Sequence, residues 1–484
     1  MSRISTPSLN GAIAALRDGH RRKRLARLAT AWLATVAVAG VIGFTTVAHR
    51  KIGLALAALV LVFGVFVADP LLLVVIALPG ALLVQRVGGA STNLSASDLL
   101  VFVGGVVCLF QVRWDRAPNL RRFLRGVLWY QAILVLVVIA HPNRYNIVEW
   151  FHRFSYLGAS VLCGWVIATY GRTRQAFCIF LAGSSVLAVI AMGYALKLHL
   201  HPAQWGAYQK NSIGAIMWVA IVVAQINPPW AGIGRRGARV TKYLCLGGLL
   251  ASQSRQSAIL LIVALGMAFL LNPELRRRSK LIVLGAAPIV LLLYYSFSVN
   301  ARNNPKFNSV SIRFGQIGAA IHVWHLSPIF GEGMRFYDLP QWVSVTAPPN
   351  VIIDNLASTG IIGSLAFFFL VWVTVRTMYR LPYALGTLGL VVLVGHYVDG
   401  LFDIFWIGGP TVAPYIICGV SLGMADLDKV ERAEAALVAN RPEPAATTGR
   451  AVVSAGRGAL RAVGRSARSV GRGFGAPAPA LPVH

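Results

Sequence analysis

The stretch L-A-S-T-G-I-I-G-S-L-A-F-F-F-L-V-W-V-T-V, residues 356–375, decides the class of fold. It contains no charged side chain, and its length matches the roughly 20 apolar residues that an α-helix needs to cross a bilayer. Arg376 follows directly, as basic residues commonly do where a helix leaves the membrane on the cytoplasmic side. The stretch is therefore predicted to be a transmembrane helix.

The composition extends that prediction to most of the chain. Of its 484 residues, 56% are apolar and only 13% are charged, against about 25% charged residues in an average soluble domain. This balance excludes an ordinary water-soluble enzyme, and it excludes disorder except at the ends. The surplus of apolar side chains is expected to face lipid.

Fourteen apolar runs are candidate spans, although several of them are short. They are 28–47, 52–68, 70–84, 98–112, 126–140, 153–170, 176–197, 212–227, 241–253, 258–271, 281–297, 356–375, 383–398 and 409–424. A short run can be a re-entrant segment, and two closely spaced runs can form one bent helix. We therefore expect an all-α fold, a polytopic transmembrane helix bundle with about 12–14 spans.

The basic residues indicate orientation rather than nucleic-acid binding. The net charge is +29, yet no nucleic-acid-binding motif accompanies it. Arginine and lysine concentrate in alternate loops, namely 113–125, 171–175, 228–242, 272–280 and 376–380. Because basic loops stay on the cytoplasmic side of a membrane, we expect both termini in the cytoplasm. The first apolar run is expected to be retained rather than cleaved as a signal peptide.

Three regions follow from this topology. Residues 1–27 form a basic cytoplasmic N-terminus, residues 28–424 a transmembrane domain, and residues 425–484 a basic cytoplasmic tail that is partly disordered. Regularly spaced arginines in the tail are typical of an amphipathic helix on the inner leaflet, while its glycines fit a solvated, disordered segment equally well. The five cysteines form no C-x-x-C motif, so neither a disulfide framework nor a thiolate metal site is expected.

The longest loop between predicted spans, 298–355, is expected on the extracytoplasmic side. Apolar residues recur at helical spacing from Ser311 to Trp324, which predicts an amphipathic helix lying on the membrane. Ser327-Pro328 ends that helix, and a glycine turn, G-E-G at 331–333, comes next. A single G-x-G is weak evidence for phosphate binding, but long ordered loops usually carry function.

Three cations fall on that same side of the membrane: Lys210, Arg255 and Arg313. A lone arginine at a helix end often extends to the lipid headgroups, and Arg255 alone would be read in that way. Three cations on one face suit an anionic ligand instead. The arginine fork matches phosphate oxygens, and its charge cannot be titrated away.

His396, Asp399 and Asp403 recur at positions i, i+3 and i+7, which predicts that they share one helix face. The spacing would allow a metal site, although three ligands on one helix without a fourth nearby are a weak signal. The alternative, which we favour, is a water-facing helix end whose polar groups hydrogen-bond to neighbouring helices.

Taken together, these features resemble the O-antigen ligase/polymerase superfamily of bacterial envelope proteins. The motifs that carry the resemblance occur in family order over roughly residues 200–410. They are N-S-I-G (Asn211–Gly214), S-Q-S-R (Ser252–Arg255), R-x10-W-x3-P-x2-G-x-G (Arg313–Gly333), P-N-x4-N-L-A-x-T-G (Pro349–Gly360) and H-x2-D-x3-D (His396–Asp403). The first 200 residues match only in hydropathy, apart from S-A-S-D at 95–98.

The resemblance implies an integral-membrane glycosyltransferase of the GT-C type in the bacterial inner (plasma) membrane. Such proteins take a glycan from an undecaprenyl-diphosphate carrier at the outer leaflet and join it to a glycan or lipid acceptor during cell-envelope polysaccharide biosynthesis. Arg255 and Arg313 would hold the diphosphate leaving group and stabilise its growing charge. Because arginines supply that charge, neither a metal nor another cofactor is expected. Further substrate-binding residues are predicted at Lys210, Asn211, Arg335, Tyr337, Asn350, His396, Asp399 and Asp403.

One position departs from the family pattern. The family commonly has His-Asn before the final apolar helix, whereas this chain has Pro349-Asn350, and a frequent glutamate in the following motif is Ser358. A general base must still reach the acceptor hydroxyl. Asp354, one helical turn beyond Asn350, is the predicted catalytic base, and His322 and His325 are poorer candidates.

Two other functions stay open from the sequence. A flippase or transporter of lipid-linked glycans also needs an extracytoplasmic cationic site, but it often shows internal repeats, and none is found here. A catalytically silent scaffold that binds envelope-assembly proteins would suit the missing histidine and the basic tail. The motifs do not separate a ligase from a polymerase.

Overall fold

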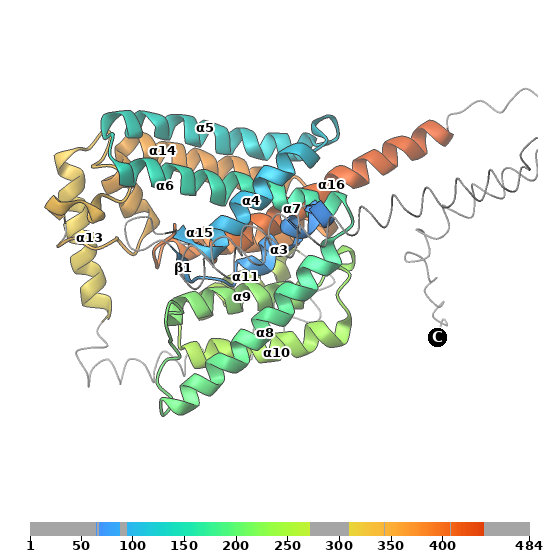
Figure 1. Ribbon diagram of the computed structural model, residues 1–484, viewed down its shortest axis with the longest axis horizontal. Helices are drawn as coiled ribbons and strands as arrows, with labels where there is room; N and C mark the ends of the chain where they lie inside the picture. The colour runs from blue at the N-terminus through green and yellow to red at the C-terminus, as the bar shows by residue number, and fades with distance from the viewer. Residues whose placement is uncertain are drawn as a thin grey trace, which may run out of the picture. The chain divides into compact units, whose positions relative to one another are not determined.

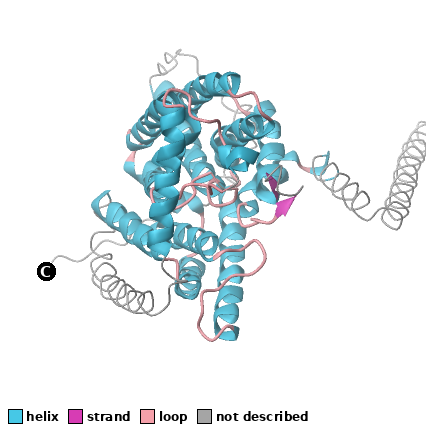
Figure 2. Cartoon of the chain, turned by 90° about the vertical axis from the view of Figure 1, so that its left-hand side faces the viewer, coloured by secondary structure: helices cyan, strands magenta, loops and turns pink. Residues whose placement is uncertain are grey.

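The computed structural model describes residues 64, 67–87, 94–271, 309–342, 344–406 and 408–439, and these are helical almost throughout (Figure 2). The α-helices are α3 (Pro70–Gly80), α4 (Ala96–Gln111), α5 (Pro118–Ala140), α6 (Arg144–Phe154), α7 (Ser160–Thr169), α8 (Thr173–Lys197), α9 (Lys210–Ile226), α10 (Arg235–Ser252), α11 (Arg255–Leu271), α13 (Ser309–Leu326), α14 (Val351–Tyr379), α15 (Tyr383–Asp399) and α16 (Val412–Ala439). The short elements are the 3₁₀ turns η1 (Trp114–Arg116), η3 (Pro229–Ala231), η5 (Phe336–Asp338) and η6 (Pro340–Trp342), the π-helical turn η2 (Ser155–Ala159), and the antiparallel strands β1 (Arg86–Val87) and β2 (Leu94–Ser95). The predicted all-α fold is confirmed.

Three of these helices, α5, α8 and α14, are long and apolar enough to cross a membrane, and α3, α4, α9, α11 and α15 are shorter apolar helices. The chain is therefore an all-α helical membrane protein. The predicted spans 28–47 and 281–297 and most of 52–68 lie outside the described residues, as do the basic segments 1–27 and 440–484. The number of spans, about 12–14, and the three-region division stay predictions.

Neighbouring helices of the bundle pack in a few close pairs (Figure 1). α10 packs against α8 and α9, α14 packs against α5 and α15, and α11 packs against both α9 and α15. At the beginning of the described chain, α3 packs against α4 and α8. The contacts of α11 with α9 and α15 bring the motif-bearing segments 210–214, 252–257 and 396–403 together.

Some helix boundaries differ from those predicted. Helix α10 begins at Arg235, so the basic residues at 235–242 form its first turns rather than a loop. Helices α6 and α7 are joined through η2 into one helical segment, which begins nine residues before the predicted run 153–170. In both places hydropathy places the boundary too late, because a helix can begin with polar residues that lie outside the lipid.

A buried carboxylate connects helices that are distant in sequence. Asp426 of α16 is 1% exposed, and it accepts hydrogen bonds from the backbone N–H groups of Asn119 (3.1 Å) and Leu120 (3.4 Å) at the start of α5. It also accepts one from Nε1 of Trp165 in α7 at 3.0 Å. The first amides of a helix have no partner within that helix and carry partial positive charge. Asp426 therefore caps α5 from outside.

We expect Asp426→Ala to lower the free energy of unfolding by about 1–3 kcal/mol, because it leaves buried donors of α5 and α7 unsatisfied. Thermal unfolding in detergent can be followed with a fluorogenic thiol dye, since four cysteines are buried and react only on unfolding. The matched control is Asp115→Ala, whose side chain is 77% exposed. Equal melting temperatures for the two variants would contradict a capping role.

Candidate functional site

The residues predicted to bind substrate lie where helices begin or end. Helix α9 begins at Lys210, α11 begins at Arg255, and α15 ends at Asp399. The start of α9 and the whole of α13 lie on the same side of the bundle, at left in Figure 1. Segments far apart in the sequence therefore meet at one end of the helices.

Arg255, Arg313 and Asp403 lie near enough to Lys210 for their charges to act on it. The positive charges of Arg255 and Arg313 act on the ammonium group of Lys210, and so does the negative charge of Asp403. Arg255 is exposed, and the other two cations are partly buried. These four residues are termed the cation cluster. Three of these four side chains are cationic and one is anionic.

Two side-chain amides orient the Asp403 carboxylate. Its Oδ2 accepts hydrogen bonds from Nδ2 of Asn211 (2.8 Å) and Nε2 of Gln256 (2.7 Å). Oε1 of Gln256 accepts one from Nη2 of Arg313 at 3.4 Å, and Nη1 of Arg313 donates to the carbonyl oxygen of Phe402. Asn211 thus belongs to the cluster as a support for Asp403. Gln256 was missed, although it lies beside Arg255 in the polar S-Q-S-R-Q-S turn.

Close packing of α9 and α11 explains two of the sequence motifs. A Cβ at Gly214 would lie 2.5 Å from Oγ of Ser257 and 2.6 Å from Cβ of Ser254, so only glycine fits there. The two serine hydroxyls are hydrogen-bonded to each other at 2.9 Å. The glycine lets the two helix N-termini meet, and this contact brings Lys210 beside Arg255.

His396 and Asp399 lie beneath the turn that carries Asp403. Helix α15 ends at Asp399, so the predicted common helix face does not reach Asp403. His396 is buried and stacks on the ring of Phe405, with centroids 4.3 Å apart. Within the part of the chain that the structure describes, Nε2 of His396 and Oδ1 of Asp399 have no hydrogen-bond partner. Across the residues that the structure describes, His, Cys, Asp and Glu side chains form no group of three that could hold a metal.

The long loop is anchored to α14 by its backbone. Its predicted helix is confirmed as α13, although it starts two residues earlier, at Ser309. The N–H groups of Glu332 and Gly333 donate to two carbonyl oxygens of α14 at 2.9 and 3.0 Å. Helix α14 is kinked there at Gly360, with φ +63°, and a Cβ on this residue would clash with the carbonyl group of Ile329. The glycine turn therefore serves to dock the loop.

Asn350 caps α14. Its Oδ1 accepts hydrogen bonds from the backbone N–H groups of Ile352 (3.0 Å) and Ile353 (3.2 Å), which is the usual role of an N-cap asparagine. Its Nδ2 donates to the carbonyl oxygen of Leu401 at 3.0 Å. The predicted substrate-binding asparagine thus joins the start of α14 to the loop 400–411 that follows α15.

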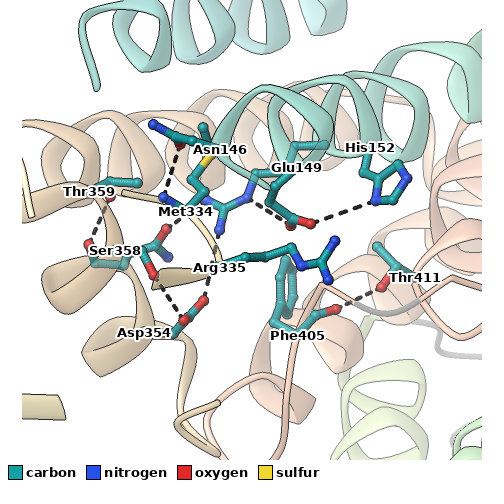
Figure 3. A network of polar contacts seen from close by, with 12 residues as sticks. Asn146, Glu149, His152, Met334, Arg335, Asp354, Ser358, Thr359, Phe405 and Thr411 are labelled. Atoms are coloured by element: carbon teal, nitrogen blue, oxygen red, sulfur yellow. Dashed lines mark hydrogen bonds and ion pairs between the residues drawn. The ribbon is translucent and has the colours of Figure 1, made fainter. Parts of the chain in front are cut away.

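A second group of charges lies among α5, α6 and α14 (Figure 3). Arg153, 1% exposed, donates through Nε to Oε1 of Glu149 (3.3 Å) and through Nη1 to the hydroxyl of Tyr130 (2.9 Å). Its Nη2 lies 3.8 Å from Oδ2 of Asp354. Nδ1 of His152 lies 3.6 Å from the Glu149 carboxylate. These five residues are termed the buried network.

The predicted base therefore belongs to the buried network. Asp354 pairs with Arg153 and accepts a hydrogen bond from Oγ of Ser358 at 3.1 Å. Oε1 of Glu149 lies 3.3 Å from Nε of Arg153, so its carboxylate pairs with the guanidinium group from the same helix face.

Arg335 and Tyr337 lie beside this network. Nε of Arg335 donates to Oδ2 of Asp338 at 2.7 Å. Burial raises the pKa of Tyr337 well above its usual value, and the charges of Asp354 and Glu149 act in the same direction. Tyr337 is therefore a neutral phenol beside the predicted base.

Glu149 and Arg153 were not predicted as site residues, although their spacing beside an apolar run was visible in the sequence. The two residues are four positions apart and immediately precede or begin an apolar run, where ion-paired charges are unusual. An i, i+4 spacing places them on one helix face. The sequence does not show that Tyr130 and Asp354 would complete the set.

The loop 400–411 connects the two groups. Its residues Phe402 and Asp403 contact the cation cluster. Its residue Trp406 places its ring 4.5 Å from the guanidinium carbon of Arg153. One short loop therefore supplies contacts both to Arg153 and to the cation cluster.

Residues 240–368 match a family model described as O-antigen ligase. The matched range contains the S-Q-S-R turn, the loop with α13 and the start of α14, while Lys210 and Asp403 lie outside it. No curated protein matches the chain. The family match supports a glycosyltransferase-like role in polysaccharide assembly. Over residues 240–368, about a quarter of its length, the chain is similar to the O-antigen ligase family, which supports the resemblance seen in the sequence.

Proposed function

We propose that this protein transfers a glycan from a polyprenyl-diphosphate carrier at the outer leaflet to the hydroxyl group of a glycan or lipid acceptor. The family resemblance suggests undecaprenyl diphosphate as the carrier. The observation that carries the proposal is that Arg255 and Arg313 lie near Lys210, and that Gln256 bridges Arg313 to the nearby carboxylate of Asp403. The bundle end that holds them would then face the periplasm or exterior, with both chain termini in the cytoplasm.

The cation cluster suits a diphosphate for two reasons. The guanidinium groups of Arg255 and Arg313 match phosphate oxygens in shape and stay charged at all physiological pH values. Lys210 and Arg255 are also the first residues of α9 and α11, and helix N-termini carry partial positive charge that favours anions. The isoprenoid chain of the carrier would remain in the lipid beside the helices.

In the proposed reaction the acceptor hydroxyl attacks the anomeric carbon of the donor glycan. The bond from that carbon to the diphosphate oxygen breaks, and its electron pair passes to the diphosphate. The cation cluster stabilises the charge that develops there, an effect that can contribute several kcal/mol, roughly 3–4 for a single donor group. The proton of the hydroxyl passes to Asp354, which lies one helical turn beyond Asn350 and close to the neutral phenol of Tyr337.

The two alternatives differ in what the charges must do. A flippase would bind the same carrier without breaking a bond, and a scaffold would bind it without turnover. The ion pair of Asp354 with Arg153 favours chemistry over transport, because it holds a carboxylate in fixed geometry close to Tyr337 and the loop 400–411.

Arg255→Ala and Arg313→Ala are each expected to lower product formation by about 10²–10³-fold, because each removes charge from the leaving group in the transition state. The assay uses purified protein in proteoliposomes with a synthetic undecaprenyl-diphosphate oligosaccharide and a glycan acceptor. The control is Arg376→Ala, at the end of α14 remote from its cap, where the arginine lies over Trp372.

Movement of the carrier across the bilayer without a new glycosidic bond would support a flippase and refute the proposal. Binding of the carrier with neither transport nor bond formation would support a scaffold. Full activity of both arginine variants would remove the cation cluster from the mechanism.

Asp354→Asn is expected to lower kcat by about 10²–10⁴-fold while the donor KM stays near that of the parent, because the amide keeps the shape of the side chain but cannot take a proton. The control is Asp115→Asn, a carboxylate whose side chain is 77% exposed. The measurement is initial rate against donor concentration. A raised KM with unchanged kcat would instead make Asp354 a binding residue.

A further inference from the structure

Arg153 is the one arginine among the five residues of the buried network, and no sequence motif pointed to it. It lies where α6 passes into η2 and is 1% exposed. An unpaired ion in such surroundings is costly, so an arginine kept there usually faces a partner that needs it. Its partners therefore indicate its role.

One set of partners holds the guanidinium group itself. Glu149, one turn earlier on α6, accepts from Nε at 3.3 Å and supplies the neutralising charge. The hydroxyl of Tyr130 on α5 accepts from Nη1 at 2.9 Å. The ring of Trp406 covers one face of the group at 4.5 Å, where cation and ring attract each other. The group is thus fixed by three elements.

The other set lies on the first turns of α14. Nη2 of Arg153 is 3.8 Å from Oδ2 of Asp354, and Nη1 donates to Oδ1 of Asn355 at 3.2 Å. The remaining oxygen of Asp354, Oδ1, accepts from Ser358 at 3.1 Å. Both oxygens of the carboxylate are therefore oriented, one by a cation and one by a hydroxyl.

These contacts are not needed to place α14. Its start is already held by the Asn350 cap, by a backbone hydrogen bond from Val351 to Gly400, and by the docked glycine turn. Removal of Arg153 would leave the helix in position and release the side chain of Asp354. Its contribution is to the direction of one carboxylate.

We propose that Arg153 is a positioning residue, which fixes the Asp354 carboxylate toward the reacting hydroxyl and is itself fixed by Glu149 and Trp406. This inference rests on the proposed function, in which Asp354 takes the acceptor proton. A carboxylate that rotates by about 1 Å away from its productive place can cost about 10²-fold in rate.

The test is a double-mutant cycle on the full-length protein in proteoliposomes. Arg153→Met is combined with Glu149→Gln so that no lone charge is left buried, and this pair is made with and without Asp354→Asn. Alone, the pair is expected to lower kcat by about 10–100-fold with the donor KM within about twofold. In the Asp354→Asn background it should cause no further loss beyond about twofold.

The matched control is Asp426→Asn, a buried polar change at the other end of α5. It is expected to lower the melting temperature and to leave the effect of Asp354→Asn unchanged. Arg153→Lys, which keeps the charge but not the fork, should restore part of kcat. A structural role alone would predict no such rescue once the melting temperatures are matched.

The possible failures are distinguishable. Losses that multiply in the cycle, or a donor KM that rises with the Arg153 change, would overturn the positioning role while the transferase stands. Full activity of Asp354→Asn would overturn the role of Arg153 together with the predicted base. No product from the parent protein, under conditions where the carrier binds, would overturn the proposed function itself.

Discussion

A charge among apolar helices must be neutralised by a partner, because its transfer out of water is costly. The two polar groups of this protein meet that constraint differently. In the buried network Arg153 is matched by Glu149 and Asp354, so its charge is fully used inside the protein. In the cation cluster three cations and one carboxylate lie near one another, and the carboxylate of Asp403 is held by the side-chain amides of Asn211 and Gln256. The first arrangement joins helices through paired charges, whereas the second brings like charges together at the helix ends.

The sequence was informative where one segment determines its own structure. Uncharged runs predict helices such as α5 and α14 because lipid requires internally satisfied backbone, and loop charge places Lys210, Arg255 and Arg313 on one side. It was uninformative where partners are distant. The hydrogen bond from Asn350 to Leu401 and the stacking of His396 on Phe405 could not be predicted, because the sequence does not show which loops adjoin these residues. Arg153 was passed over because Tyr130 and Asn355 come from other helices.

The departure from the family motif becomes intelligible in this setting. Pro349 is buried immediately before the N-cap, a position that requires no backbone donor, so the proline is compatible with the start of α14. The cap is made by Asn350, which this chain keeps. The family histidine can therefore be replaced by Pro349 without altering how the helix begins.

The π-helical turn Ser155–Ala159 gives the helical segment 144–169 one residue more than a regular helix of the same rise would hold. Each α-helical residue adds about 100° of rotation. The extra residue thus turns the Glu149–Arg153 face through roughly a quarter of a circle relative to α7. A deletion of one residue in that turn would therefore rotate Arg153 away from Tyr130 and Asp354 while the run of apolar residues in α7 stays unbroken.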